Sequence, residues 1–64
     1  MKKNKRYIVI DKDSISYTIY GDNGDLIEVK CLEISPKGRV KLQFQSGHEE
    51  WTCPDNYKII EELL

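Results

Sequence analysis

Alanine is absent from this sequence, and its absence weighs against a helical domain because alanine is the strongest helix former. Long apolar runs are also absent, so no segment approaches the ~20 apolar residues of a membrane-spanning helix. The apolar stretch at residues 7–10 follows a basic start but is too short for a secretory signal peptide. We therefore expect a cytoplasmic protein that does not enter a membrane.

Histidine and cysteine are scarce: His48 is the one histidine, and Cys31 and Cys53 are the two cysteines. A metal site needs more ligands at closer spacing, so we expect no metal and no cofactor. His48 stands beside Glu49, and such a pair can act in acid–base catalysis, but a chain this short leaves no room for an enclosed cleft. We therefore predict no catalytic residues and no enzyme. In a reducing cytoplasm both cysteines are expected to be buried free thiols, with a disulfide as the alternative.

The residues that are abundant favour a β-sheet. Sixty-four residues make one domain, and among them are eight isoleucines, three valines and four tyrosines, which suit a half-buried pleated surface. Alternating or continuous apolar patterns predict short strands along most of the chain. The predicted strands are residues 6–11, 14–20, 26–34, 39–45, 50–53 and 58–60.

The segment 14–20 shows a regular alternation of apolar and polar residues. Ile15, Tyr17 and Ile19 fall on one face of a strand with this period, and the polar residues fall on the other. We therefore predict that these three side chains lie in the core.

The segment 26–45 is predicted to form a β-hairpin. Its first strand changes apolar phase near Cys31 and Leu32, which indicates a β-bulge or a sharp bend. A turn with proline at its second position and glycine at its fourth, residues 35–38, leads into the second strand. The side chains of the second strand that are predicted to point inward are Val40, Leu42 and Phe44.

The second half of the chain has a characteristic order: a long strand, a Pro-Gly turn, an aromatic strand, a tight turn, a 3₁₀ turn and a final strand. The residues that carry this order are Phe44, Ser46-Gly47, Glu50-Trp51, Pro54-Asp55 and Tyr57-Lys58-Ile59-Ile60. Over about residues 25–62 the chain resembles SH3-like and Tudor-like small barrels. The resemblance implies an all-β fold: a small SH3-like, partly open barrel of five to six short antiparallel strands with one 3₁₀ turn. This domain would span residues 7–64, after a flexible basic leader at residues 1–6.

Several aromatic side chains are candidates for a binding surface. In Tudor-like barrels, rings near strand ends form a cage for a methylated cation, so the resemblance implies such a role for Tyr20, Trp51 and Tyr57. Glu50 and Asp55 stand near two of these rings in the sequence and would attract a cation. These five residues are the predicted partner-binding residues. The alternative is that Trp51 and Tyr57 close the ends of the barrel.

Charge is distributed unevenly along the chain. Four of the ten basic residues lie in the first six positions, and the remaining residues carry six basic and eleven acidic side chains, a net charge of −5. Clustered Lys and Arg dominate nucleic-acid binding, so an acidic body argues against a broad phosphate-binding face. These observations predict a non-catalytic protein-interaction module. This build is typical of a small stand-alone accessory or inhibitor protein of bacteria or phages.

A small nucleic-acid-binding protein is the alternative function. The basic leader and the hairpin would then contact the phosphate backbone. The residues of this predicted surface are Lys2, Lys3, Lys5, Arg6, Lys37, Arg39 and Lys41. Open strand edges would also allow a homodimer.

Overall fold

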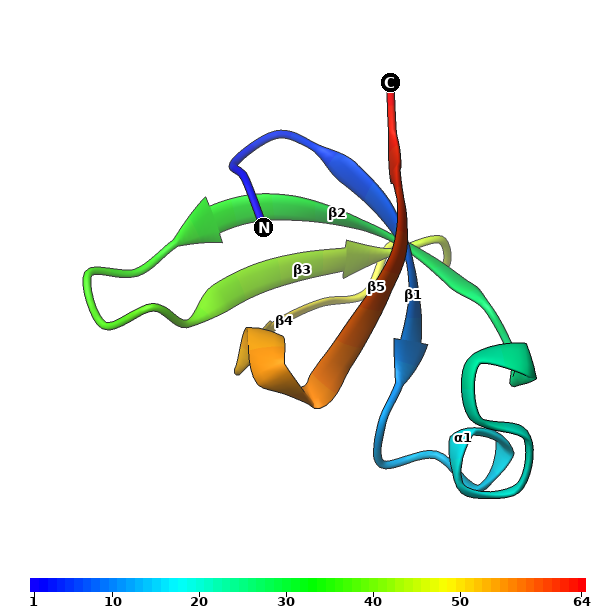
Figure 1. Ribbon diagram of the computed structural model, residues 1–64. Coiled ribbons are helices and arrows are strands. Elements are labelled where there is room, and N and C mark those ends of the chain that lie inside the picture. The colour runs from blue at the N-terminus through cyan, green and yellow to red at the C-terminus, as the bar shows by residue number, and fades with distance from the viewer.

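The computed structural model describes all 64 residues and contains five strands, one short α-helix and two 3₁₀ turns (Figure 1). The strands are β1 (Arg6–Asp11), β2 (Ile27–Ile34), β3 (Val40–Phe44), β4 (Glu49–Thr52) and β5 (Tyr57–Leu63). The helix is α1 (Ile15–Tyr20), and the 3₁₀ turns are η1 (Gly21–Asn23) and η2 (Pro54–Asn56). No helix is long and apolar enough to cross a membrane.

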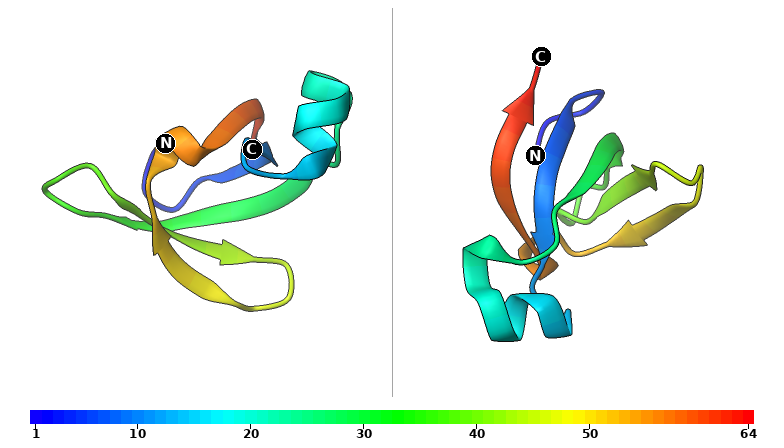
Figure 2. Two further views of the ribbon diagram at one scale, coloured as in Figure 1. Left: turned by 90° about the horizontal axis from the view of Figure 1, so that it is seen from below. Right: turned by 90° about the vertical axis from the view of Figure 1, so that its right-hand side faces the viewer.

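The strands form one antiparallel sheet in the order β4-β3-β2-β1-β5. Figures 1 and 2 show that this sheet is strongly twisted. The two edge strands, β4 and β5, do not pair with each other, so the sheet is not closed. The predicted all-β, partly open architecture is therefore confirmed. The last strand is longer than expected because it pairs with β1 from Asp11↔Tyr57 to Arg6↔Leu63, with a register shift between Ile8 and Val9.

The predicted hairpin is confirmed in β2 and β3. Its register shifts between Cys31 and Glu33, where the change of apolar phase predicted a bulge. Leu32 is the extra residue, and this allows Cys31 and Leu42 to meet in the core while the strand bends. The turn after β2 places Gly38 at φ 87°, a conformation that glycine adopts without strain.

The core lies on one face of the three central strands. A cluster of six buried side chains comes in pairs from β1, β2 and β3: Tyr7, Val9, Val29, Cys31, Val40 and Leu42. Ile10 of β1 is also fully buried, outside this cluster. Phe44 and Tyr57 are partly buried and pack against this cluster. The buried Cys31 fits the prediction of a buried free thiol, whereas the prediction is wrong for Cys53, which is free but exposed.

The predicted strand at residues 14–20 is wrong, because this segment forms α1. Ser14 caps the helix: its hydroxyl accepts the Tyr17 N–H at 3.0 Å and donates to the Asp11 carbonyl at 2.7 Å. Ile15 and Ile19, expected in the core, are 77% and 64% exposed. β1 already has β2 and β5 on its two sides, so no sheet edge is free beside it for a further strand.

The N-terminal segment, predicted as a leader at residues 1–6, is hydrogen bonded to the sheet. The Asn4 N–H donates to the Cys31 carbonyl at 2.7 Å, and the Cys31 N–H donates to the Lys5 carbonyl at 2.9 Å. The Lys2 N–H donates to the Tyr7 hydroxyl at 2.6 Å, and Arg6 is the first residue of β1. The segment therefore continues the pairing between β1 and β2.

Gly24 packs tightly where the chain returns from η1 to α1. A Cβ atom at Gly24 would lie 2.9 Å from Ser16 Oγ and 3.0 Å from the Ser16 carbonyl oxygen. We expect Gly24→Ala to lower the free energy of unfolding by about 1–3 kcal/mol, because the backbone must move to remove the overlap. Chemical denaturation followed by circular dichroism measures the change. Asn23→Ala, at an exposed neighbouring position, is the control, and an equal effect of both substitutions would contradict the close packing of Gly24 on Ser16.

Candidate functional site

The structure places the predicted partner-binding residues on separate elements. Tyr20 ends α1 and is 62% exposed, Trp51 lies in β4 and is 43% exposed, and Asp55 is in η2. α1 and β4 are far apart in both Figure 1 and Figure 2. Tyr57 starts β5 and is half-buried, and its ring pairs with neither Tyr20 nor Trp51. A shared cage of Tyr20, Trp51 and Tyr57 is therefore not present.

Trp51 and Glu50 point to opposite faces of the sheet. In the pairing of β3 with β4, Glu50 lies opposite Leu42, whose side chain is in the core, and Trp51 lies opposite Lys41. Because neighbouring residues of a strand alternate between faces, Glu50 is on the core side and Trp51 is on the outer side. Glu50 therefore remains near Tyr57, and Trp51 does not.

Tyr57 instead joins two rings that the sequence did not single out for binding. The centroids of Tyr57 and Phe44 are 6.5 Å apart, and those of Phe44 and His48 are 6.0 Å apart with nearly parallel planes. Phe44 is half-buried at the end of β3, and His48 is exposed in the turn before β4. The sequence predicts Phe44 as a core residue, and in the structure it packs against the core while remaining partly accessible.

Three carboxylates act on Tyr57 through their charge, and one of them, Asp11, lies directly opposite it in the pairing of β1 with β5. Burial raises the pKa of Tyr57, and the negative charges of Asp11, Glu50 and Asp13 raise it further. These three acids come from the end of β1, from β4 and from the turn before α1. Asp11 and Asp13 form no ion pair, and Glu50 pairs only with His48, at 3.8 Å between Oε2 and Nε2. No lysine or arginine therefore forms an ion pair with these three carboxylates.

We call this group the aromatic–acidic site; its residues are Asp11, Asp13, Phe44, His48, Glu50 and Tyr57. No protein-family model matches this chain, and no curated protein or solved structure matches it either. The site is therefore interpreted from its own chemistry. Accessible aromatic rings beside carboxylates attract cations, through the ring faces and through direct charge attraction.

The basic residues predicted to bind nucleic acid lie near the C-terminal half of β2 and the turn that follows it. Lys37 and Arg39 lie in the turn between β2 and β3, and Lys41 follows in β3. Two residues of the predicted set are ion-paired: Arg6 with Glu28 at 3.4 Å and Lys41 with Glu49 at 3.5 Å. These carboxylates reduce the positive potential that phosphate binding requires.

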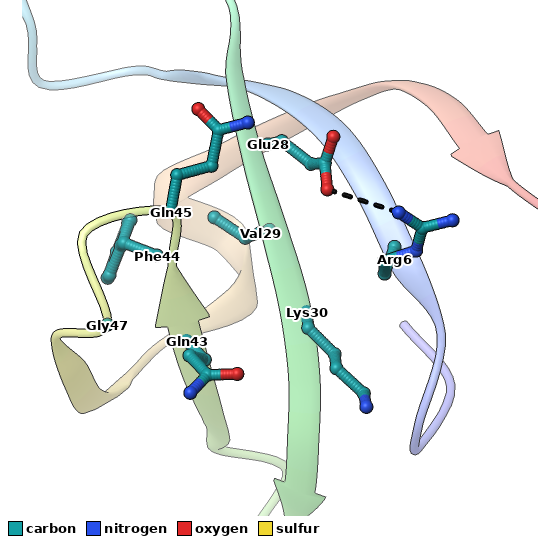
Figure 3. Close-up of a pocket in the computed structure, with 8 residues that line it drawn as sticks. All are labelled: Arg6, Glu28, Val29, Lys30, Gln43, Phe44, Gln45 and Gly47. Carbon is teal, nitrogen blue, oxygen red and sulfur yellow. Dashed lines mark hydrogen bonds and ion pairs between the residues drawn. The ribbon is translucent and has the colours of Figure 1, made fainter.

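A shallow hollow of about 300 Å³ lies beside Arg6 on the outer face (Figure 3). Arg6, Lys30 and Gln43 are neighbours across β1, β2 and β3, and Figure 3 shows Arg6 directed at Glu28. The full lining is Arg6, Glu28, Val29, Lys30, Gln43, Phe44, Gln45 and Gly47. Lys30 is the one cation of this lining without an ion pair. The hollow therefore combines opposite charges and does not extend the basic surface.

Proposed function

We propose that this protein is a non-catalytic protein-interaction module that binds a cationic side chain of a protein partner at the aromatic–acidic site. The observation that supports it is the position of the half-buried Tyr57, which lies beside Phe44 and opposite Asp11 in the pairing of β5 with β1. Glu50, on the same side of the sheet, and Asp13 add negative charge there, and no lysine or arginine pairs with Asp11 or Asp13. A guanidinium or ammonium group would replace the missing positive charge and contact the rings. Two of the predicted binding residues, Glu50 and Tyr57, belong to this site.

The wider setting of the proposal comes from composition. The two free thiols, Cys31 and Cys53, suit a reducing compartment, so we place the protein in the cytoplasm. A net charge of −5 outside the first six residues supports a basic protein partner, which an acidic surface attracts over long range. The role of a small accessory or inhibitor protein is consistent with such a surface.

Titration with small cationic probes tests the proposal. N-acetyl-arginine amide and N-acetyl-trimethyllysine amide are added to isotope-labelled protein, and NMR shifts are followed. We expect the largest shifts at Phe44, His48 and Tyr57. Asp13→Asn and Glu50→Gln should each weaken probe binding roughly two- to five-fold, the range of an exposed ion pair.

Glu61→Gln is the matched control, because it makes the same carboxylate-to-amide change at an exposed position of β5 outside the site. Equal weakening by Glu61→Gln would show that general charge, and not this site, attracts the probes. A short DNA duplex is titrated in parallel. Shifts at Lys2, Lys37 and Arg39 with DNA, and none at Tyr57 with the cationic probes, would favour the nucleic-acid alternative.

A further inference from the structure

The helix α1 turns its apolar side to solvent. Ile15 is 77% exposed, Ile19 is 64% exposed and Tyr20 is 62% exposed, and no residue of the helix is buried. Leu26, just after η1, is 58% exposed. An ordinary surface helix points such residues at the core and its polar residues at water. We call Ile15, Ile19, Tyr20 and Leu26 the α1 surface.

The four side chains lie on α1 and on the segment that returns from it. Ile15 and Ile19 are four residues apart and therefore neighbours on the helix, whereas Tyr20 is about 100° further around. The Asp25 N–H donates to Ser16 Oγ at 2.7 Å, so the chain that returns from η1 packs against α1. This contact brings Leu26 next to the helix. Tyr17, on the opposite side of α1, is half-buried.

The α1 surface is held on a fixed support. Lys58 Nζ lies 2.6 Å from both carboxylate oxygens of Asp22, which ties η1 to β5. At the other end, the Ser14 cap joins the start of α1 to the end of β1. Figure 2 shows α1 and η1 projecting at one end of the molecule, beyond the sheet. A projecting element that is already ordered loses little entropy when it enters a groove.

The segment that carries the α1 surface is acidic. Residues 11–26 contain four aspartates and one lysine; Asp22 pairs with Lys58, whereas Asp11, Asp13 and Asp25 form no ion pair. A second copy of the chain, placed face to face through a twofold axis, would bring these like-charged segments together. A partner with basic residues around an apolar groove would complement both the apolar side chains and the acidic segment.

We propose that the α1 surface docks into an apolar groove, bordered by lysine or arginine, on a folded protein partner. Large exposed apolar side chains that are grouped and rimmed by charge are typical of interaction sites, because water contact with them is unfavourable. This inference goes beyond the cation-binding function. The two surfaces share only the region of Asp11 and Asp13, so each can be tested without the other.

Site-specific photo-crosslinking is the first step of the test. The full chain, carrying a benzophenone amino acid in place of Ile19, is irradiated in cells of the source, and the same amino acid in place of Lys37 is the control. A protein crosslinked from position 19 and not from position 37 is identified by mass spectrometry and purified. The binding of this partner to the unmodified chain is then measured by calorimetry. The structure of the partner is determined separately, to describe the surface that was crosslinked.

The proposal expects Ile15→Ser with Ile19→Ser to weaken this binding on the order of 100-fold, as for two contact residues of an interface centre. Asp25→Asn should weaken binding a few-fold, and added salt should weaken it further. Ile34→Ser, at an exposed isoleucine of β2, should leave it unchanged. Melting curves of the α1 variants should match the wild type, because these side chains are exposed.

Four results would overturn the proposal. These are crosslinks from position 19 to a second copy only, no crosslinked protein, a partner that binds the double variant as tightly as the wild type, or a partner surface without an apolar groove and basic border. Glu50→Gln separates the two proposals. Two- to five-fold weaker binding of the cationic probes with unchanged partner affinity would support both surfaces independently.

Discussion

Replacing Leu42 with alanine is expected to lower the free energy of unfolding by about 2–5 kcal/mol, which would unfold much of a domain this small at room temperature. Leu42 has no solvent exposure and stands in the middle of β3, opposite Cys31 of β2 and Glu50 of β4. Its removal opens a cavity among the six buried residues, and a core of that size has little capacity to close around it. Urea denaturation followed by circular dichroism measures the loss.

Ile19→Ala is the matched control for Leu42→Ala. Ile19 is 64% exposed, so its truncation should change the free energy of unfolding by no more than about 0.5 kcal/mol. A strand at residues 14–20 with Ile19 in the core would instead make the two substitutions similarly destabilising. The comparison therefore tests directly whether this segment is the exposed helix α1.

Thiol reagents are expected to modify Cys53 at least about 100-fold faster than Cys31. Cys53 is exposed before η2, whereas Cys31 has no solvent exposure and reacts only after the structure opens. Each 1.4 kcal/mol of opening free energy slows the reaction tenfold, and a few kcal/mol gives the expected ratio. Burial also raises the pKa of the Cys31 thiol, partly offset by the positive N-terminal amino group, so less of the reactive thiolate forms.

Labelling with iodoacetamide at neutral pH, followed by peptide mass spectrometry, gives both rates in one sample. Addition of urea above the unfolding midpoint should make the two rates similar, because both thiols are then in water. Similar rates in the folded protein would contradict the position of Cys31 in the core. Cys53→Ser shows whether modification of the exposed thiol alters access to the buried one.

The elements read correctly from the sequence are those specified by neighbouring residues. Val40, Leu42 and Phe44 alternate with polar residues after a Pro-Gly turn, and this pattern predicts a hairpin. The prediction is possible because the turn and the side-chain period both depend on neighbouring residues. The bulge beside Cys31 was also visible, since a one-residue change of phase moves the apolar side chains to the other face. Residues 54–56 form the 3₁₀ turn for the same local reason, with proline at its start.

The segment 14–20 could not be assigned in this way because its pattern suits two structures. Ile15 and Ile19 fit the period of a strand, and they are also neighbours on a helix. The Ser14 cap favours the helix. The sheet also excludes a strand beside β1, because β2 and β5 occupy both of its edges. The isoleucines of this helix are exposed, and they are the basis of the α1 surface.

Taken alone, the sequence determined a small all-β domain, a central hairpin with its bulge, and an acidic body, because composition, period and turn chemistry are carried by nearby residues. The binding surfaces depend on contacts between distant ones. Asp11 reaches Tyr57 only because β5 pairs with β1, and Phe44 meets the same ring across the core. Such contacts are set by strand order and register, which come from the burial of the whole core and not from any local segment.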